Sequence, residues 1–323
     1  MTAMTSVLIE REVRKTSDPG IANFAIWTRA LLLALPLALP AVAGELEIDD
    51  RVESFQKFYA AATHAKLSDD QRFALWQSDG GLAAVPPGPK GDSMARALLD
   101  KAWPRYPSLI PVLPSLARAA EEGARELFET DIKILDAGDE PLHSRLILYV
   151  GQFDDNAFSI PAMSGKPATT VMSVENSAYR RVLAHELAHT IHFQLAGIDN
   201  AFEAPVGEKM FLEGLAMRTA QRAEPGQVDA DYAAMPNDHK WMPRCAANKD
   251  RIIARILPDL DKAGPDIAFK YTFGKGNTGL QREVYCAAWF AFETLLNQGH
   301  SLPELARIPE EKMAETMRAA LTR

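Results

Sequence analysis

The stretch "RRVLAHELAHTIHFQL" at residues 180–195 contains three of the 7 histidines of this 323-residue chain. Its apolar residues surround His185, Glu186, His189 and His192 as in a buried helix. His185 and His189 are four residues apart, so their imidazoles project from one face of a helix on successive turns and can bind one metal ion. Glu186 is placed to act on a metal-bound water without binding the metal. This H-E-x-x-H arrangement is typical of zinc hydrolases and predicts a catalytic zinc site.

The alternative is a group of interior histidines that are satisfied only by hydrogen bonds. Two buried imidazoles and a carboxylate in so apolar a helix need partners that offset their desolvation. A divalent cation is the simplest such partner, so the sequence favours one zinc ion per chain. His192 lies on the same face as His189 and could support a ligand, but a structural role is favoured because three ligands suffice for catalytic zinc.

A third ligand is expected from the apolar stretch "MFLEGLAM" at residues 210–217. A helix this apolar is buried, and an unpaired carboxylate inside it would carry a desolvation penalty of several kcal/mol. Glu213 should therefore be neutral, paired or bound to a cation. Gly214 costs about 1 kcal/mol relative to alanine inside a helix, which indicates that another group approaches closely at this turn.

These considerations predict Glu213 as the third zinc ligand, ahead of two other glutamates. Glu208 is turned well away from Glu213 around the helix, and Glu203 falls in a loop without an apolar frame. A salt bridge from Glu213 to Arg180 or Arg181 is the alternative, although fully buried ion pairs are rare.

Hydrophobic periodicity and turn signals predict a mainly helical α+β protein. Helices are expected from Asp49 to about Gln77, and at residues 93–103, 115–132, 207–222, 251–262 and 280–299. Two β-like runs at residues 145–151 and 169–175 precede the histidine helix, which should begin after Asn176 or Ser177 and end at Gly197. The expected organisation is a leader at residues 1–43, a helical region at 44–144 and a catalytic region at 145–323.

The leader is predicted from the apolar run that follows Arg29 and from the small-x-small pattern at residues 41–43. This combination indicates a signal peptide that is cleaved after Ala43, and hence an exported, periplasmic protein. The alternative is a membrane anchor, but the run from Ala30 to Ala43 is shorter than the roughly 20 residues that a spanning helix needs. After removal of the leader, no stable membrane insertion is expected.

The chain has 2 cysteines, Cys245 and Cys286. Oxidising compartments allow a disulfide between them. Two buried thiols are equally compatible with the sequence.

The formal charge of −8 argues against a nucleic-acid partner, because binding to phosphate backbones relies on clustered Lys and Arg. The oligomeric state cannot be inferred from the sequence.

The motifs "HELAH" and "FLEGLA" together resemble the gluzincin metallopeptidases, in which a glutamate on the next helix completes the zinc site. With a late helix that contains a tyrosine and with "SLPELARIPEE", residues 145 to 310 look like the predicted zinc-dependent proteases called the DUF2268 family. The resemblance implies a thermolysin-like core with a small sheet, an active-site helix and a helical subdomain. It also implies a peptide or protein substrate, and it makes "TTVMSVE" at residues 169–175 the substrate-side strand.

The chain departs from the thermolysin pattern at two points. Met217 stands where an aspartate would orient one histidine, so this support must come from elsewhere. The histidine that stabilises the oxyanion has no counterpart by motif. By analogy with the family's late helix, Tyr285 is the first candidate for that role, with Tyr271 and His239 as runners-up. Tyr285 could equally be a core aromatic residue.

The sequence thus predicts an exported zinc metallopeptidase with Glu186 as general base. Two other functions remain open. One is a zinc-stabilised binding or chaperone-like protein without turnover, although a purely structural site would not require Glu186. The other is a metal-dependent hydrolase of non-peptide amides or esters.

Overall fold

The computed structural model describes residues 44–85, 88–154, 157–201, 203–233 and 238–322. The predicted leader, residues 1–43, lies outside these residues, so its assignment stays a prediction. None of the described helices combines the length and apolar character that crossing a membrane would require.

Helices predominate over one small sheet, as expected for the predicted α+β class. The first half of the described chain contains β1 (Glu45–Asp50), α2 (Val52–His64), α3 (Asp69–Ser78), α4 (Pro89–Ala102), α5 (Tyr106–Leu109), α6 (Leu113–Ile134), β2 (His143–Tyr149), β3 (Ala157–Ile160) and β4 (Ala168–Ser173). The second half contains α7 (Tyr179–Ala196), α8 (Val206–Ala223), α9 (Asp229–Tyr232), α10 (Trp241–Ala247), α11 (Lys249–Ile256), α12 (Pro265–Thr272), α13 (Glu283–Asn297), α14 (Leu302–Leu305) and α15 (Glu310–Leu321).

The sheet has the strand order β1-β2-β4-β3. The two predicted strands correspond to β2 and β4, whereas β1 and β3 were not predicted. β1 pairs in parallel with β2, and Arg145 on β2 bridges the acidic side chains of Glu47 and Asp49 on β1. Because β1 lies in the region expected to be only helical, the sheet extends across the predicted boundary at residue 144.

β4 is an interior strand. It pairs in parallel with β2 on one side and antiparallel with β3 on the other. Its backbone groups are therefore already used within the sheet, so the prediction that residues 169–175 form the substrate-side strand is wrong. Within the described sheet, the free edge on that side belongs to β3.

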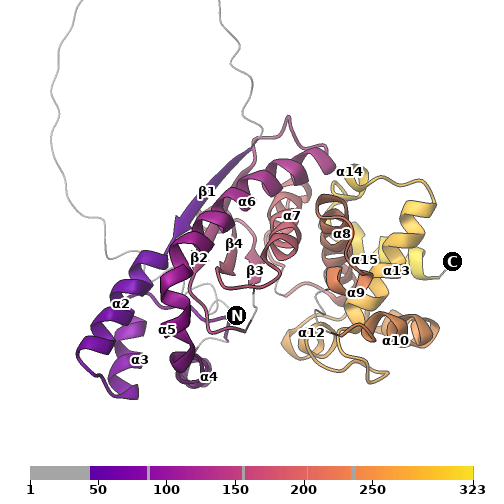
Figure 1. The fold of residues 1–323 in the computed structure, drawn as a ribbon. Coiled ribbons are helices and arrows are strands. Elements are labelled where there is room, and N and C mark those ends of the chain that lie inside the picture. Colours follow the sequence, from indigo (N-terminus) through magenta and orange to yellow (C-terminus); the bar gives the residue numbers. More distant parts are fainter. Residues whose placement is uncertain (1–43, 86–87, 155–156, 202, 234–237, 323) are drawn as a thin grey trace, which may run out of the picture.

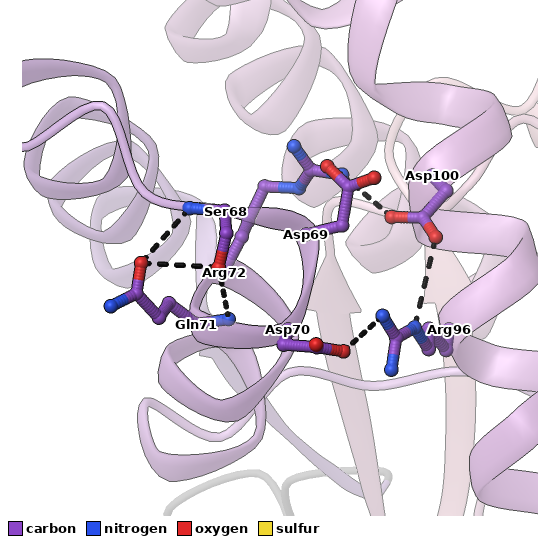
Figure 2. A network of polar contacts seen from close by, with 7 residues as sticks. All are labelled: Ser68, Asp69, Asp70, Gln71, Arg72, Arg96 and Asp100. Atoms are coloured by element: carbon purple, nitrogen blue, oxygen red, sulfur yellow. Dashed lines mark hydrogen bonds and ion pairs between the residues drawn. The ribbon is translucent and has the colours of Figure 1, made fainter.

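The N-terminal helix predicted from Asp49 to Gln77 is in fact broken into α2 and α3. Lys66 adopts a left-handed backbone conformation with φ of 48°, and Ser68 then starts α3 with a capping box to Gln71. Figure 2 shows this cap and the ion pairs that join α3 to α4, among them Arg72 with Asp100 at 2.6 Å. The S-x-x-Q pattern at residues 68–71 is the sequence signal of this second helix start.

α7 lies at the centre of the molecule and contacts α6, α8, β3 and β4. Figure 1 shows α7 between the sheet and α8, with α13 and α15 beyond α8. Gly197 ends α7 in a left-handed conformation with φ of 69°, as predicted. The helix starts later than predicted, because its N-cap is Ala178, whose backbone N–H donates to Asn176 Oδ1 at 2.9 Å.

Cys245 on α10 and Cys286 on α13 form a disulfide across a sequence separation of 41 residues. This resolves the alternative that the sequence left open. In the chain-entropy model, a closed loop of this size contributes about 4 kcal/mol to stability. The bond fixes α10 against the N-terminal half of α13.

Candidate metal centre

His185 and His189 point their Nε2 atoms at each other across one turn of α7. The two atoms are 3.1 Å apart, and the ring centroids are separated by 4.8 Å. This is the arrangement expected for residues i and i+4 on one helix face.

Glu213 reaches the two histidines from α8. Its Oε2 atom is 3.1 Å from His185 Nε2 and 3.7 Å from His189 Nε2. Among the described residues, these three form the only cluster of His, Cys, Asp or Glu side chains whose ligand atoms all lie within 4.8 Å of one another. The structure therefore brings together the three residues that the sequence predicts as ligands.

The three donor atoms fit a tetrahedral zinc ion. Ligand atoms that each lie about 2.0–2.2 Å from such an ion are roughly 3.3–3.6 Å from one another. The observed separations of 3.1 and 3.7 Å lie close to this range. Two imidazole nitrogens and one carboxylate oxygen are also the donor set of many catalytic zinc sites.

The charges of the three groups depend on one another. Burial opposes a charge on His189, but the carboxylates of Glu213 and Glu186 together outweigh burial and raise the pKa of His189. Burial would also raise the pKa of Glu213, but hydrogen bonds and charges from the two imidazoles hold this pKa well below its usual range. Glu213 is therefore an ionised carboxylate. It can accept a proton from the histidines or bind a cation together with them.

The cluster remains accessible to solvent. The side chains of His185, His189 and Glu213 are 11%, 9% and 17% exposed. Water or a small ion can therefore reach it.

Glu186 lies next to the cluster and is held by the sheet. The Ser159 hydroxyl is 2.8 Å from Glu186 Oε2 and 2.9 Å from the backbone oxygen of Glu186. The Thr170 hydroxyl is 3.0 Å from Ser159 Oγ and 3.3 Å from the same backbone oxygen. One hydroxyl from β3 and one from β4 therefore anchor the predicted general base. Neither contact could be predicted from the sequence, because β3 carries no recognisable strand signal.

Tyr285 lies beside the cluster of predicted ligands, whereas the two runners-up do not contact this cluster. Burial raises the pKa of Tyr285 far above its usual range, and the charge of the Glu213 carboxylate raises it further. Tyr271 instead donates its hydroxyl to Asp259 Oδ2 at 2.6 Å, and His239 is an exposed residue before α10. Tyr285 is thus both a buried aromatic residue of α13 and a neighbour of the predicted ligand.

His192 has no hydrogen-bonded partner among the described residues and is fully buried. It packs against Phe211, with ring centroids 5.8 Å apart. Burial and the nearby His189 lower the pKa of His192 to about 3. It is therefore a neutral interior imidazole at ordinary pH, in line with the structural role favoured by the sequence.

The outer nitrogens of the two histidines predicted as ligands are also without partners in the described part of the chain. Nδ1 of His185 and Nδ1 of His189 are both buried and accept or donate no hydrogen bond there. Met217, the residue where thermolysin-type enzymes carry an aspartate, is fully buried. The described residues therefore supply no contact that would orient either imidazole through Nδ1.

The alternatives to Glu213 are engaged in other contacts. Glu208 is 3% exposed, and burial raises its pKa to about 8, with Glu310 as a further cause. Glu203 contacts Asn200. Arg180, an alternative partner for Glu213, instead pairs with Glu126 and Glu224.

Gly214 allows close packing of α8 against α13, as its position predicts. A Cβ atom at this residue would lie 2.2 Å from Cδ2 of the Phe292 ring. Phe292 is fully buried and cannot move aside without disturbing the core.

We expect Gly214→Ala to lower the free energy of unfolding by about 1–3 kcal/mol through overpacking. Denaturant unfolding measures this effect. Gly138→Ala is the matched control, because a Cβ atom there meets nothing within 4 Å. Equal stability of the two variants would show that α8 and α13 are not packed as described.

Comparisons of the chain with protein-family models, curated proteins and solved structures found no match. The resemblance to gluzincins and to the DUF2268 family therefore rests on the sequence motifs alone, and the thermolysin-like core stays a prediction.

Proposed function

We propose that this protein is an exported zinc metallopeptidase of the gluzincin type, with one zinc ion bound by His185, His189 and Glu213. The observation that carries the proposal is the convergence of these three donors beside a glutamate that is not among them. A purely structural zinc site would need a fourth protein ligand and would not need Glu186.

When bound, zinc acts as a Lewis acid that lowers the pKa of a water molecule to about 7 and polarises a carbonyl group. Glu186 accepts the proton of the attacking water at its carboxylate and passes it to the leaving amine. Ser159 fixes this carboxylate by donating to Oε2. Tyr285, with its proton retained by its raised pKa, donates a hydrogen bond to the oxygen of the scissile carbonyl as negative charge develops.

The disulfide supports the proposed export. Such bonds persist in oxidising compartments, including the periplasm, and are rare in the cytosol. Cleavage after Ala43 would leave a mature protein that starts at Gly44, where β1 follows directly.

Hydrolysis of a mixed peptide library by protein purified from the periplasm tests the proposal. We expect cleavage that stops when a chelator removes the metal and that returns on addition of zinc. Zinc binding without any turnover would favour the non-catalytic binding or chaperone-like alternative. Zinc-dependent cleavage of small esters or amides, with no cleavage of peptides, would favour the other hydrolase.

A further inference from the structure

Arg282 stands beside the proposed metal centre without a role in the mechanism. Its Cζ atom is 5.0 Å from the centroid of the Tyr285 ring. The Glu213 carboxylate lies close enough to this ring for its charge to raise the pKa of the Tyr285 hydroxyl. One aromatic ring therefore separates the guanidinium from the predicted zinc ligands.

The backbone of Arg282 is held in a strained position. It adopts a left-handed conformation with φ of 61° and ψ of 48° at the N-cap of α13. Non-glycine residues in this conformation are uncommon and concentrate at functional sites. The surrounding fold must therefore hold Arg282 in this left-handed conformation.

The frame around Arg282 is rigid. Its N–H donates to Gly274 O at 3.2 Å. The backbone N–H and the hydroxyl of Thr278 donate to Glu283 Oε1, at 2.7 and 2.5 Å. Trp241 Nε1 donates to Gln281 O at 2.9 Å. The disulfide of Cys286 follows one turn later. These contacts hold the backbone of Arg282 in place, and the guanidinium extends from it.

The guanidinium of Arg282 has no ion pair or hydrogen bond to any described residue, although the side chain is half-buried. Arg180 and Arg145, by contrast, each contact two carboxylates. Arg181, one turn before His185 on the same face of α7, also has no carboxylate partner in the described chain, and its buried Nε makes no hydrogen bond. Arg282 and Arg181 are thus half-buried arginines without a carboxylate partner among the described residues.

Arg282 contacts the Tyr285 ring. Its guanidinium N–H groups donate to none of the described residues, so they are available to a ligand. Two parallel N–H groups of an arginine match the two oxygens of a carboxylate. A half-buried cation with free donors next to a reaction centre is complementary to an anionic group on the ligand.

We propose that Arg282 binds a carboxylate of the substrate and thereby selects peptides that carry one close to the scissile bond. This inference rests on the proposed peptidase function. Because one tyrosine ring separates Arg282 from the ligand cluster, the carboxylate belongs one or two residues from the scissile bond, at about 3.3 Å per residue of extended chain. The carboxylate is either the free C-terminus of a short peptide or an Asp or Glu side chain.

Three peptide hydroxamates of the same backbone test the inference on the zinc-loaded full chain. The first ends in a free carboxylate, the second ends in a carboxamide, and the third ends in a carboxamide but carries a glutamate side chain at the same residue. Calorimetry measures their binding, so the readout does not require turnover. We expect the first or the third to bind roughly 10- to 100-fold more tightly than the second, as for hydrogen bonds to charged groups. The tighter of the two identifies the source of the carboxylate.

Arg282→Gln should abolish this preference, and Arg282→Lys should retain part of it. Arg222→Gln is the matched control, because Arg222 is an exposed arginine nine residues beyond Glu213 on α8. It should keep the full preference. If Arg282→Gln fails to fold, the lysine variant and the preference of the parent protein still decide the question.

Equal binding of the three hydroxamates to zinc-loaded parent protein would overturn this inference and leave the metal site intact. A preference that survives in Arg282→Gln would also overturn it. Failure to bind zinc at all, measured separately by equilibrium dialysis, would overturn the proposed function and this inference together.

Discussion

Glu186→Gln is expected to bind zinc as tightly as the parent protein and to hydrolyse peptides about 10²- to 10⁴-fold more slowly. The amide keeps the shape of the side chain but cannot accept a proton, and general-base catalysis contributes about this factor. Ser159 can still donate to the amide oxygen, so the local structure around α7 should persist. Single-turnover hydrolysis and zinc content measured on the same sample check both parts.

Glu129→Gln is a suitable control for Glu186→Gln, since Glu129 is an exposed carboxylate on α6. It should leave both zinc content and rate unchanged. Full hydrolytic activity of Glu186→Gln at equal zinc content would rule out Glu186 as the base. Loss of zinc in this variant would instead mean that Glu186 belongs to the ligand set.

The sequence was informative wherever function depends on the spacing of residues along one helix. Two histidines four residues apart on α7 must share a face, so their convergence follows from helix geometry. The apolar surroundings of Glu213 and the cost of Gly214 predicted a carboxylate that faces a partner and a close approach on α8. The structure has the histidine–carboxylate contacts and the nearby Phe292 ring.

The missed features depend on contacts between distant segments. β3 has four residues and exists through its pairing with β4, so local propensity could not reveal it or the Ser159 contact to Glu186. β1 is an acidic segment whose charges are balanced by Arg145 on β2. The position of Arg282 over Tyr285 depends on a left-handed backbone at a non-glycine residue, for which the sequence carries no signal.

The largest effect on metal binding is expected from Glu213→Ala, which should weaken zinc binding by at least about 100-fold. Changes to residues that only orient a ligand cost 10- to 100-fold in metal affinity, so removal of a ligand should cost more. Competition with a chromophoric chelator measures the affinity. Glu208→Ala is the matched control, because Glu208 is a more deeply buried glutamate on the same helix but is not in the donor cluster. It should bind zinc as the parent protein does.

The pH dependence of zinc binding separates a ligand from a mere neighbour. Zinc requires neutral imidazoles, so protons compete with it, and the parent protein should lose zinc as pH falls through the raised pKa of His189. Without Glu213, burial would lower that pKa, opposed by the remaining charge of Glu186. Protons would then compete less near neutral pH, and the affinity of Glu213→Ala should be weaker but less dependent on pH. If the variant bound zinc as tightly as the parent at pH 8, where proton competition is small, Glu213 would only be a hydrogen-bond partner of the histidines and the third ligand would have to be sought elsewhere.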